Sequence, residues 1–378
     1  MFTLIMEYIY RHLLKYDEVW CDTMGIFNPY TDPFDVTFSQ KVPMFDKQAY
    51  NMFPKYNFVY DKLWVCKSQN LKCGTLESLY ENNDVNYPIF IKPRWGHLSA
   101  SSKNCFKIKS YEELLKYKDL KNMMWSEYID GQEYMTDYVL LNGVIIYQLS
   151  YLYSKDQFGY IEKHKYISPD NKSIPEIDTW VNEYMVGYSG IVNVQMRDNK
   201  IIEVGLRPAR GGAYIQSTNN TKITEMINYV YEKNIDIVYN PDTLDFKPYY
   251  SFKCFTRVPF FYIFPQYFID FIMYIFGCKK FYEYYFEPNG RDGMVWFQFL
   301  HNNYNTGNSV RYILTLLLVL SQIFILLLIF YIFYDYYKTK KLNKVLTVAL
   351  ILIYLTNYLN PISVQYNWHK SRKQKIFL

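Results

Sequence analysis

An uncharged run of 23 residues near the C-terminus constrains this chain more than any other feature. It covers 312–334 and reads YILTLLLVLSQIFILLLIFYIFY. At a rise of about 1.5 Å per residue, a helix of this length crosses the hydrocarbon core of a bilayer, which is about 30 Å thick. Tyrosines stand at both ends, as is typical at a membrane interface. We therefore expect a transmembrane helix here; the alternative is a helix buried in a soluble core.

A second apolar segment, 345–364, follows closely and contains Asn360-Pro361 near its end. We expect it to span the bilayer as well, with a re-entrant or an interfacial segment as alternatives. Both the linker at 335–344 and the tail at 370–375 are lysine-rich, and the positive-inside rule would place both in the cytosol. Two spans cannot satisfy both. We expect a multi-pass membrane protein whose N-terminal domain and tail are cytosolic, so that the linker opposes the rule.

Composition limits the classes of protein that this chain can represent. Its 378 residues are 50% hydrophobic, enough for two or three units with a large core. The net charge of +5 is weak and dispersed, so a nucleic-acid partner is not expected. The six cysteines form no CxxC pair and are expected to be free thiols. The first residues have no basic segment and no small-residue cleavage site, so we expect a short amphipathic helix there and no signal peptide.

The pattern of residues changes along the chain. Residues 1–60 look irregular, strand and helix patterns alternate from about 61 to 235, and 236–311 form an aromatic-rich connecting or interfacial region. Ser110 followed by Glu113 is a capping-box pattern that opens a helix over 110–117, and a further helix is expected over 221–231. Six runs bounded by turn residues are typical of strands: 88–92, 123–128, 133–141, 144–151, 190–196 and 200–204.

The last two of these strands form the most informative motif outside the apolar segments. Gln195 and Glu203 lie eight residues apart around the turn signal Asp198-Asn199. With a three-residue loop centred on Asn199, Gln195 lies directly opposite Glu203 and the two side chains share one face. An amide oxygen and a carboxylate placed in this way suit Mg²⁺. A two-residue turn would shift the register and separate the pair.

Four further motifs precede this hairpin. YPIFIKP ends at Lys92 and Pro93, the loop RWGHLSASSK follows, WSEYIDGQEYMTDYVLLNGVI comes next, and IEKHK lies between it and the hairpin. The order of these motifs, from about 61 to 216, resembles the ATP-grasp superfamily. The resemblance implies an α+β fold in which two α+β subdomains clasp ATP, here followed by C-terminal transmembrane helices. The ATP-grasp domain would cover 61–235, and 1–60 would be a short preceding region.

The resemblance implies nucleotide-binding roles for several residues. Lys92 would contact the phosphates as a compact positive charge, and the small-residue loop, including Ser101, would close over them. Glu127 would border the adenine, whose edge the backbone of Tyr128 and Ile129 would bind. Glu133 would approach the ribose or the metal, and Gly131 would permit a left-handed turn before the next strand.

The resemblance also implies how the reaction would be supported. Gln195 and Glu203 match the metal-binding positions, whereas Gly205 stands where Asn is usual and offers no side chain to a second Mg²⁺. Lys163 or Lys165 would neutralise charge on the transferred phosphoryl group. Arg207 and Arg210 would bind a carboxylate or an acyl-phosphate, because guanidinium groups match such oxygens.

Taken together, the sequence predicts a membrane-anchored ligase that joins a carboxylate to an amine through an acyl-phosphate. Its cofactors would be ATP and Mg²⁺, and its partners the membrane and a carboxylate and an amine that the sequence does not identify. The alternative is a catalytically degenerate ATP-grasp scaffold that acts as a membrane-bound interaction protein, which Gly205 and the glycine-poor loop favour. A transporter is disfavoured, because the apolar segments carry no charge that would line an ion path.

Overall fold

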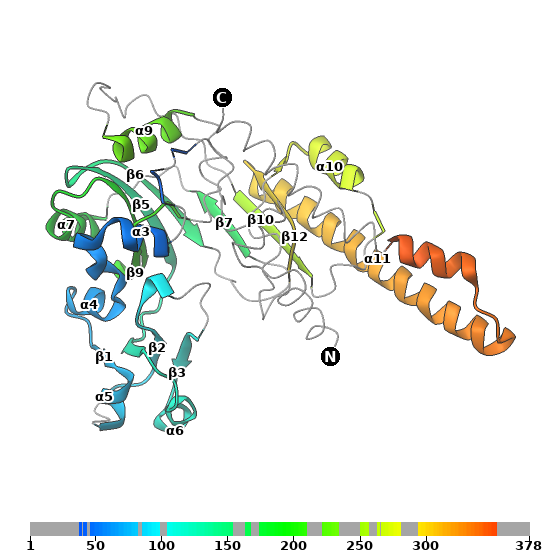
Figure 1. The fold of residues 1–378 in the computed structure, drawn as a ribbon, viewed down its shortest axis with the longest axis horizontal. Coiled ribbons are helices and arrows are strands. Elements are labelled where there is room, and N and C mark those ends of the chain that lie inside the picture. The colour runs from blue at the N-terminus through cyan, green and yellow to red at the C-terminus, as the bar shows by residue number, and fades with distance from the viewer. Residues whose placement is uncertain are drawn as a thin grey trace. The chain divides into compact units, whose positions relative to one another are not determined.

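The computed structural model of this chain is shown in Figure 1 and divides into two compact units. We call residues 35–155 and 166–248 the sheet unit, and residues 1–34, 156–165 and 249–378 the helix unit. The domain boundaries expected near 60 and 235 stay a prediction. The structure describes residues 38–39, 41–43, 46–81, 85–98, 104–153, 163–167, 174–209, 221–233, 250–256, 263–264, 266–280 and 294–353.

The sheet unit contains a small antiparallel sheet with the strand order β1-β4-β2-β3. Helices α5 (Leu76–Glu81) and α6 (Tyr111–Leu114) pack on it, and Leu79, Ile91 and Leu114 are among the buried residues of its core. The strands are β1 (Cys73–Thr75), β2 (Ile89–Pro93), β3 (Phe106–Ile108) and β4 (Met123–Glu127). A 3-10 turn, η3 (Gly96–Leu98), follows β2, and another, η4 (Leu115–Tyr117), continues α6.

A larger antiparallel sheet in the same unit has the order β6-β5-β8-β9. Its strands are β5 (Glu133–Leu141), β6 (Val144–Tyr153), β8 (Gly190–Arg197) and β9 (Lys200–Gly205). One face of β8 and β9 is apolar and is buried under four elements in a single core. These are α3 (Asp46–Met52), η2 (Pro54–Tyr60), α4 (Lys62–Lys67) and α7 (Pro175–Tyr184). Helix α9 (Thr221–Glu232) contacts β5 and β8, and Figure 1 shows it in green beside this sheet.

The hairpin of β8 and β9 differs from its expected geometry in one respect. Arg197 pairs with Lys200, so the turn contains two residues, Asp198 and Asn199, both with positive φ. A bulge on β9 then adds one residue, Ile202, before the next pair. Gln195 therefore lies opposite Glu203 after all. The turn is therefore the two-residue alternative, but the pair is not separated as expected for it: the opposed register of Gln195 and Glu203 is confirmed, because the extra residue restores the pairing.

Residues 46–60 correct the expectation of an irregular N-terminal region. Helices α3 and η2 form there, and Ala49, Val59 and Tyr60 are buried in the core of the larger sheet. Both elements have seven residues, too short for a helical period to stand out in the sequence. Their formation therefore depends on tertiary burial more than on local propensity. Residues 1–37, including the expected amphipathic helix, lie outside the described residues.

The helix unit combines a small sheet with long helices. Strands β10 (Tyr250–Thr256), β11 (Lys279–Lys280) and β12 (Met294–His301) pair in the antiparallel order β11-β12-β10. Helices α10 (Gln266–Ile275) and α11 (Tyr304–Thr339) share a core with these strands, in which Phe252, Met273 and Leu314 are buried. The region 236–311 thus contains strands, which its continuous aromatic character had concealed.

Helix α11 confirms the long helix expected over 312–334 and begins earlier, at Tyr304, behind an N-cap in which Asn303 accepts a hydrogen bond from Thr306. By length and composition it could cross a membrane, and it is the one helix in the described part of the chain that could. The next helix, Lys344–Ile353, has ten residues, and 354–364 lie outside the described residues. We therefore reduce the two expected spans to one candidate.

Candidate functional site

Alternate residues of three neighbouring strands bring polar side chains to one face of the larger sheet, which we call the polar face. Three rows of directly opposed residues cross β5, β8 and β9 on this side. They are Glu133, Arg197 and Lys200; Met135, Gln195 and Glu203; and Asp137, Asn193 and Gly205. The residues between them, such as Val194 and Val204, point into the apolar core. The strand period of two thus gathers several candidate residues on one surface.

Glu133 connects two of these rows. Its Oε2 accepts hydrogen bonds from Arg197 Nη2 at 2.6 Å and Nε at 3.1 Å, and its Oε1 accepts one from the amide nitrogen of Gln195. The predicted metal ligand Gln195 therefore lies beside another predicted site residue. Within the described part of the chain, the amide oxygen of Gln195 accepts no hydrogen bond, so this oxygen is the one that Gln195 can offer to a cation.

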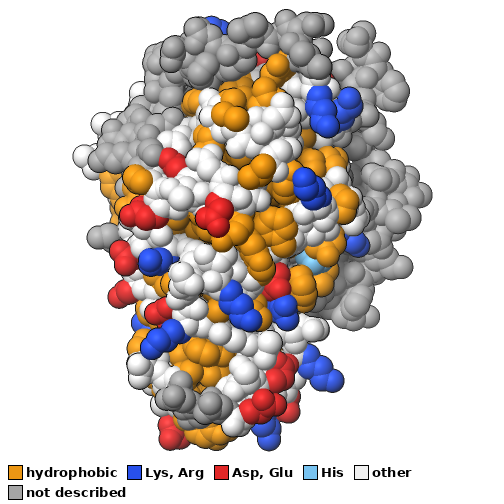
Figure 2. All heavy atoms as spheres, turned by 90° about the vertical axis from the view of Figure 1, so that its left-hand side faces the viewer, with side chains coloured by type: hydrophobic (Ala, Val, Ile, Leu, Met, Phe, Trp, Pro, Cys, Tyr) orange, Lys and Arg blue, Asp and Glu red, His pale blue; other side chains and the backbone are white. Residues whose placement is uncertain are grey.

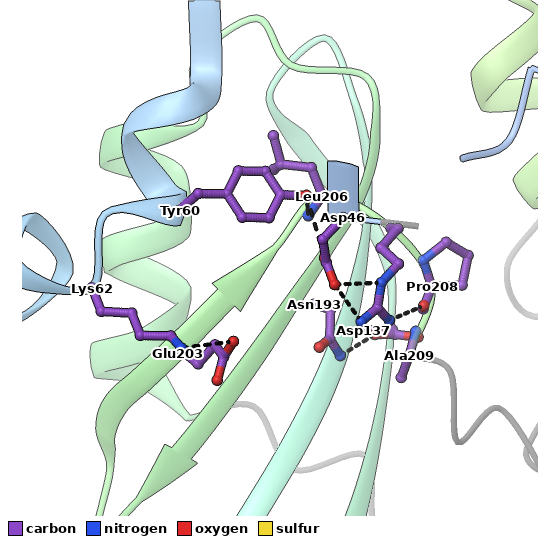
Figure 3. Close-up of polar contacts among 10 residues, drawn as sticks. Asp46, Tyr60, Lys62, Asp137, Asn193, Glu203, Leu206, Pro208 and Ala209 are labelled. Carbon is purple, nitrogen blue, oxygen red and sulfur yellow. Dashed lines mark hydrogen bonds and ion pairs between the residues drawn. The ribbon is translucent and has the colours of Figure 1, made fainter. Parts of the chain in front are cut away.

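Two buried lysines approach β9 from other elements. Lys62 Nζ, from α4, lies 3.3 Å from Glu203 Oε1, and Figure 3 shows its side chain extending to that carboxylate. Lys92, at the end of β2, donates from Nζ to the carbonyl oxygen of Ile202 at 2.7 Å. Both residues are more than nine-tenths buried. Burial lowers the pKa of Lys92, and the positive charge of Lys62 adds to this effect. Two cations and one carboxylate thus meet at the bulge.

Asp61 and Arg94 hold the elements that carry these lysines. Asp61 caps α4, since its Oδ1 accepts a hydrogen bond from Leu63 N at 3.1 Å. Arg94, which follows β2, donates from Nε to Asp61 Oδ1 at 2.8 Å and from Nη2 to Oδ2 at 2.5 Å. Lys62 follows Asp61 directly and Lys92 lies two residues before Arg94, so the ion pair joins the two segments that carry the lysines. The cap was detectable in the sequence, because an Asp precedes an apolar run.

A second group of contacts forms where the chain leaves β9. Arg207 donates from Nε at 3.0 Å and from Nη2 at 2.7 Å to Asp46 Oδ2. Tyr60 donates its hydroxyl to Asp46 Oδ1 at 3.4 Å and accepts a hydrogen bond from Leu206 N at 3.0 Å. Burial, and secondly the charge of Asp46, raise the pKa of Tyr60, so its hydroxyl stays protonated and able to donate.

The row of Asp137, Asn193 and Gly205 has one carboxylate at each end: Asp137 belongs to the row itself, and Asp46 lies beside Gly205. Asn193 donates to Asp137 Oδ1 at 2.5 Å, and Asp137 Oδ2 accepts a hydrogen bond from Ala209 N at 3.0 Å (Figure 3). Across the row, a Cβ placed on Gly205 would lie 2.9 Å from Asp46 Oδ1. A side chain at this position would require the carboxylate of Asp46 to shift. The absence of Asn at position 205, noted in the sequence, thus has a steric counterpart in Asp46.

The turn η3 lies close to the carboxylate of Glu203. A Cβ on Gly96 would lie 3.5 Å from Glu203 Oε1, and the ring of His97 stacks on Tyr50 with centroids 3.8 Å apart. Burial lowers the pKa of His97, and its Nδ1 has no hydrogen-bond partner in the described part of the chain. The loop that was expected to close over phosphates therefore begins beside Glu203.

The segment expected to bind adenine joins the small sheet to the larger one. Glu127 is the last residue of β4, and its Oε1 accepts a hydrogen bond from Lys72 N at 2.9 Å. Tyr128 packs under Lys107, whose Nζ lies 3.6 Å from the ring centroid, and Ile129 follows it outside regular structure. Gly131 has a φ of 111°, which confirms the expected left-handed turn before β5.

Three expected site residues cannot be placed by their side chains. Ser101 and Arg210 lie outside the described residues, and Lys163 begins strand β7 (Lys163–Ile167), of which the backbone alone is described. Conversely, Asp46, Lys62, Asp137 and Asn193 were not among the predicted site residues. Asp137 and Asn193 lie within expected strands, and the pairing of β5 with β8 brings them together. Asp46 and Lys62 reach the polar face through the packing of α3 and α4.

The polar face offers oxygen atoms as metal ligands. The described residues contain no group of three or more His, Cys, Asp or Glu side chains placed to hold a metal ion among themselves. Gln195 and Glu203 are a pair, and a cation bound there would need further oxygens from water or from a phosphorylated ligand, as Mg²⁺ commonly does. Cys66, Cys73, Cys105 and Cys278 are free thiols, as expected.

The surface of the sheet unit carries both signs of charge. Figure 2 shows Lys and Arg side chains interspersed with Asp and Glu on the face seen there, with apolar side chains between them. A field of one sign, which steers strongly charged macromolecules, is not visible on this face. Lys62 and Lys92, in contrast, are buried.

Comparisons with known proteins find similarity in structure only. No family model matches this sequence, and no curated protein matches it. The L-amino acid ligase from Bacillus licheniformis is 12% identical, with 72% of each chain covered and a TM-score of 0.43. Carboxyaminoimidazole ribonucleotide synthase from Aspergillus clavatus, complexed with ATP, is 9% identical, with 73% of this chain and 80% of that chain covered and a TM-score of 0.49.

A third similar structure is N5-carboxyaminoimidazole synthetase from Staphylococcus aureus complexed with ADP. It is 14% identical, with 79% of this chain and 84% of that chain covered and a TM-score of 0.47. These similarities to ATP-grasp enzymes are distant and concern the fold alone. The reaction and the ligands of this chain have to be inferred from its own residues.

Proposed function

We propose that this protein is an ATP- and Mg²⁺-dependent ligase that joins a carboxylate to an amine through an acyl-phosphate, held at a membrane by α11. The observation that carries the proposal is the meeting of Lys62, Lys92 and Glu203 at the bulge of β9, directly across from Gln195. Cations from two other elements and oxygen ligands from the hairpin converge on this one region of the polar face.

The two lysines support a polyphosphate ligand. Each is buried, and a buried ammonium group is costly unless an anion or several hydrogen bonds stabilise it. Glu203 neutralises one positive charge of the two, so the cluster of Lys62, Lys92 and Glu203 has a formal charge of +1. Bound phosphate oxygens would lower the electrostatic energy of this cluster. The segment from Glu127 to Glu133 would hold the adenosine part, and Ser101 would cover the phosphates.

The oxygen atoms of the polar face support Mg²⁺ as the metal. Glu203 and the amide oxygen of Gln195 share a row, and Glu133 lies next to Gln195. All three offer oxygen, which Mg²⁺ prefers, and phosphates would complete its coordination. Bound ATP and Mg²⁺ would supply the phosphoryl group that activates the carboxylate. Lys92 and Lys163 would neutralise negative charge on that group.

Arg207 and Arg210 would hold the carboxylate that receives the phosphoryl group. A guanidinium matches two carboxylate oxygens, and Arg207 already binds a carboxylate of this chain. The amine would then attack the acyl carbon, and phosphate would leave. The residues of the chain orient the reactants and stabilise charge, and no covalent bond to the enzyme is needed.

Membrane attachment is proposed from the exposed apolar surface of the helix unit. Only 22% of the most apolar window of α11 is buried, and Leu316, Leu327 and Phe330 are among its exposed residues. Helix α10 buries Ile269 and Met273 but exposes Phe271 and Tyr274. Helices that are apolar on both sides are typical of buried or lipid-facing positions. We therefore propose one span in α11, with α10 at the interface.

The test of the proposed reaction is ADP release by the purified protein with pools of amino acids and carboxylic acids. We expect sustained ADP release when both the carboxylate and the amine are present, and we expect Glu203→Ala to abolish it. Glu176→Ala, which changes an exposed acid on α7, serves as the matched control. Release that is absent in every pool, or equal in Glu203→Ala, contradicts the proposal.

The second candidate is a degenerate scaffold that keeps the fold for interaction. It is favoured by the contacts of Gln195 and Glu203, which are engaged with Glu133 and Lys62, and by Gly205, which offers no ligand. This candidate predicts that the protein does not bind ATP with Mg²⁺, whereas ligase turnover excludes it.

A further inference from the structure

We propose that Arg207, Tyr60 and the space above Gly205 form a binding site for the carboxylate of a substrate, and that Asp46 occupies this site in the structure. The inference rests on the proposed function in naming that ligand a substrate. The site itself is built from contacts of the sheet unit alone. Its intramolecular occupant comes from α3, an element that the sequence did not connect with function.

The geometry around Asp46 is that of a bound carboxylate. One oxygen, Oδ2, accepts two hydrogen bonds from the guanidinium of Arg207, and the other, Oδ1, accepts one from the hydroxyl of Tyr60. The two charge-assisted bonds from Arg207, at 3.0 and 2.7 Å, are the strong ones, and the bond from Tyr60 is longer, at 3.4 Å. Tyr60 is in turn held by Leu206 N, so the donors are fixed by the backbone that follows β9.

Gly205 completes the site by leaving space. A Cβ at this position would lie 2.9 Å from Asp46 Oδ1, closer than side-chain carbons approach other atoms. The missing side chain is therefore what allows a carboxylate oxygen to lie over the strand. The same space would admit an oxygen of an external carboxylate once Asp46 is displaced.

The place of the site on the polar face agrees with such a role. Gly205 and Glu203 lie two residues apart on β9 and point to the same side, so the carboxylate of Asp46 lies next to the row of Glu203 and Gln195. A carboxylate bound in its place would be adjacent to the proposed phosphate and metal ligands. Release of α3 from Arg207 would open the site, and return of Asp46 would close it in the absence of substrate.

A tethered occupant competes with any external ligand. The apparent affinity for a carboxylate is reduced by the fraction of molecules in which Asp46 occupies the site, so removal of Asp46 must increase that affinity. Acetate is a suitable probe, because it has the size of the side chain that Asp46→Ala removes. The full-length protein in detergent is treated with phenylglyoxal, and modification of Arg207 is measured by mass spectrometry of the peptide 201–210.

In the wild type we expect slow modification of Arg207 and little further protection by acetate. In Asp46→Ala we expect faster modification, and acetate should restore protection at a concentration at least about tenfold lower than in the wild type. Chloride at equal ionic strength should not protect. Asp119→Ala, which removes an exposed acid elsewhere in the sheet unit, should behave as the wild type does.

The double variant Asp46→Ala/Gly205→Ala tests whether acetate binds in the space above Gly205. Its new methyl group fills the space over β9, so acetate protection should be lost. Asp46→Asn, which keeps the shape of the side chain, replaces Asp46→Ala if that variant does not fold. Two results would overturn the inference. One is that Arg207 is modified at the same rate in the wild type and in the Asp46 variants. The other is that acetate still protects Arg207 in the double variant Asp46→Ala/Gly205→Ala. The assay contains no ATP, so its failure is distinct from a failure of the proposed ligase reaction.

Discussion

Gln195 lies directly opposite Glu203, although the turn between their strands contains only two residues. The pairing is possible because Ile202 adds one residue to β9. In a bulge the extra residue leaves the regular ladder, and here the carbonyl oxygen of Ile202 accepts a hydrogen bond from Lys92. One irregular residue thus sets the register of the proposed metal ligands and binds the lysine proposed to contact phosphate.

The turn itself can be tested by substitution of Asn199. Its φ of 55° is favourable for Gly and Asn and strained for a β-branched residue. We expect Asn199→Val to lower the free energy of unfolding by about 1–2 kcal/mol and Asn199→Gly to leave it unchanged or raise it by up to about 0.5 kcal/mol. Chemical denaturation of the two variants measures this; equal stabilities would contradict the two-residue turn.

Lys92→Met should separate function from stability. The substitution removes a buried charge, which is favourable, and leaves the carbonyl oxygen of Ile202 without its donor, which is not. We expect these effects to offset one another within about 2 kcal/mol of unfolding free energy. Nucleotide affinity should nevertheless fall about 10- to 100-fold, because a charged hydrogen bond to phosphate is lost. Calorimetric titration with ATP, beside a denaturation curve, measures both quantities.

The same pair of proteins gives a prediction for pH. Burial lowers the pKa of Lys92 from its ordinary value of 10.5. Between the lowered pKa and 10.5, the unfolded chain holds more protons on this group than the folded chain does. Stability of the wild type relative to Lys92→Met should therefore rise as pH increases through that window. A difference that falls or stays constant up to pH 10.5 would show that the ammonium group is not desolvated.

Asp61 is predicted to be important for the position of both lysines. Asp61→Ala removes the cap of α4 and the partner of Arg94. We therefore expect the free energy of unfolding to fall by about 2–3 kcal/mol. Asp61→Asn keeps an oxygen for the cap and should lose about half as much. Nucleotide affinity should follow the same order. If both variants lose the same stability, the cap contributes nothing measurable.

Three exposed residues of α11 distinguish a lipid-facing helix from a soluble one. Leu320, Phe324 and Leu327 are 50%, 51% and 62% exposed. At the centre of a membrane each change to Asp costs about 2.5–3.5 kcal/mol, so the triple variant should no longer resist alkaline extraction from membranes. On a helix that faces water, the same changes would leave the protein folded and increase its solubility. Val186→Asp, at an exposed apolar residue of the sheet unit, is the control.

Local patterns in the sequence located the regular parts of the fold. The strand β5 begins and ends where the flanking turn residues placed it, at Glu133 and Leu141. The helix expected at Ser110 begins there, with Ser110 capping Glu113 N, although Glu113 accepts its return hydrogen bond from Lys109 N instead of from Ser110. Short elements such as β1, β3 and α3 have too few residues to show a period.

The spacing of residues predicted a contact within the site only where both partners lie on one hairpin. Gln195 and Glu203 could be paired from their spacing, because a turn and two strands relate them locally. Lys62 and Asp46 reach the same face from 141 and 159 residues earlier in the chain, counting from Glu203 and Gly205. Their positions follow from the packing of α4 and α3, which no local pattern encodes. The bulge at Ile202 was not predicted either, because no residue pattern in this hairpin marks it.

The central claim is that Lys92, Glu203 and Gln195 form a site for ATP with Mg²⁺, and nucleotide binding tests it most directly. Wild-type protein, Lys92→Met and Glu203→Gln are titrated with ATP, once with Mg²⁺ and once with a chelator. We predict that the wild type binds ATP more tightly with Mg²⁺, that Lys92→Met weakens binding under both conditions, and that Glu203→Gln removes the gain from Mg²⁺ alone. A wild type that binds no ATP, or a Glu203→Gln variant with the full gain from Mg²⁺, would contradict the account.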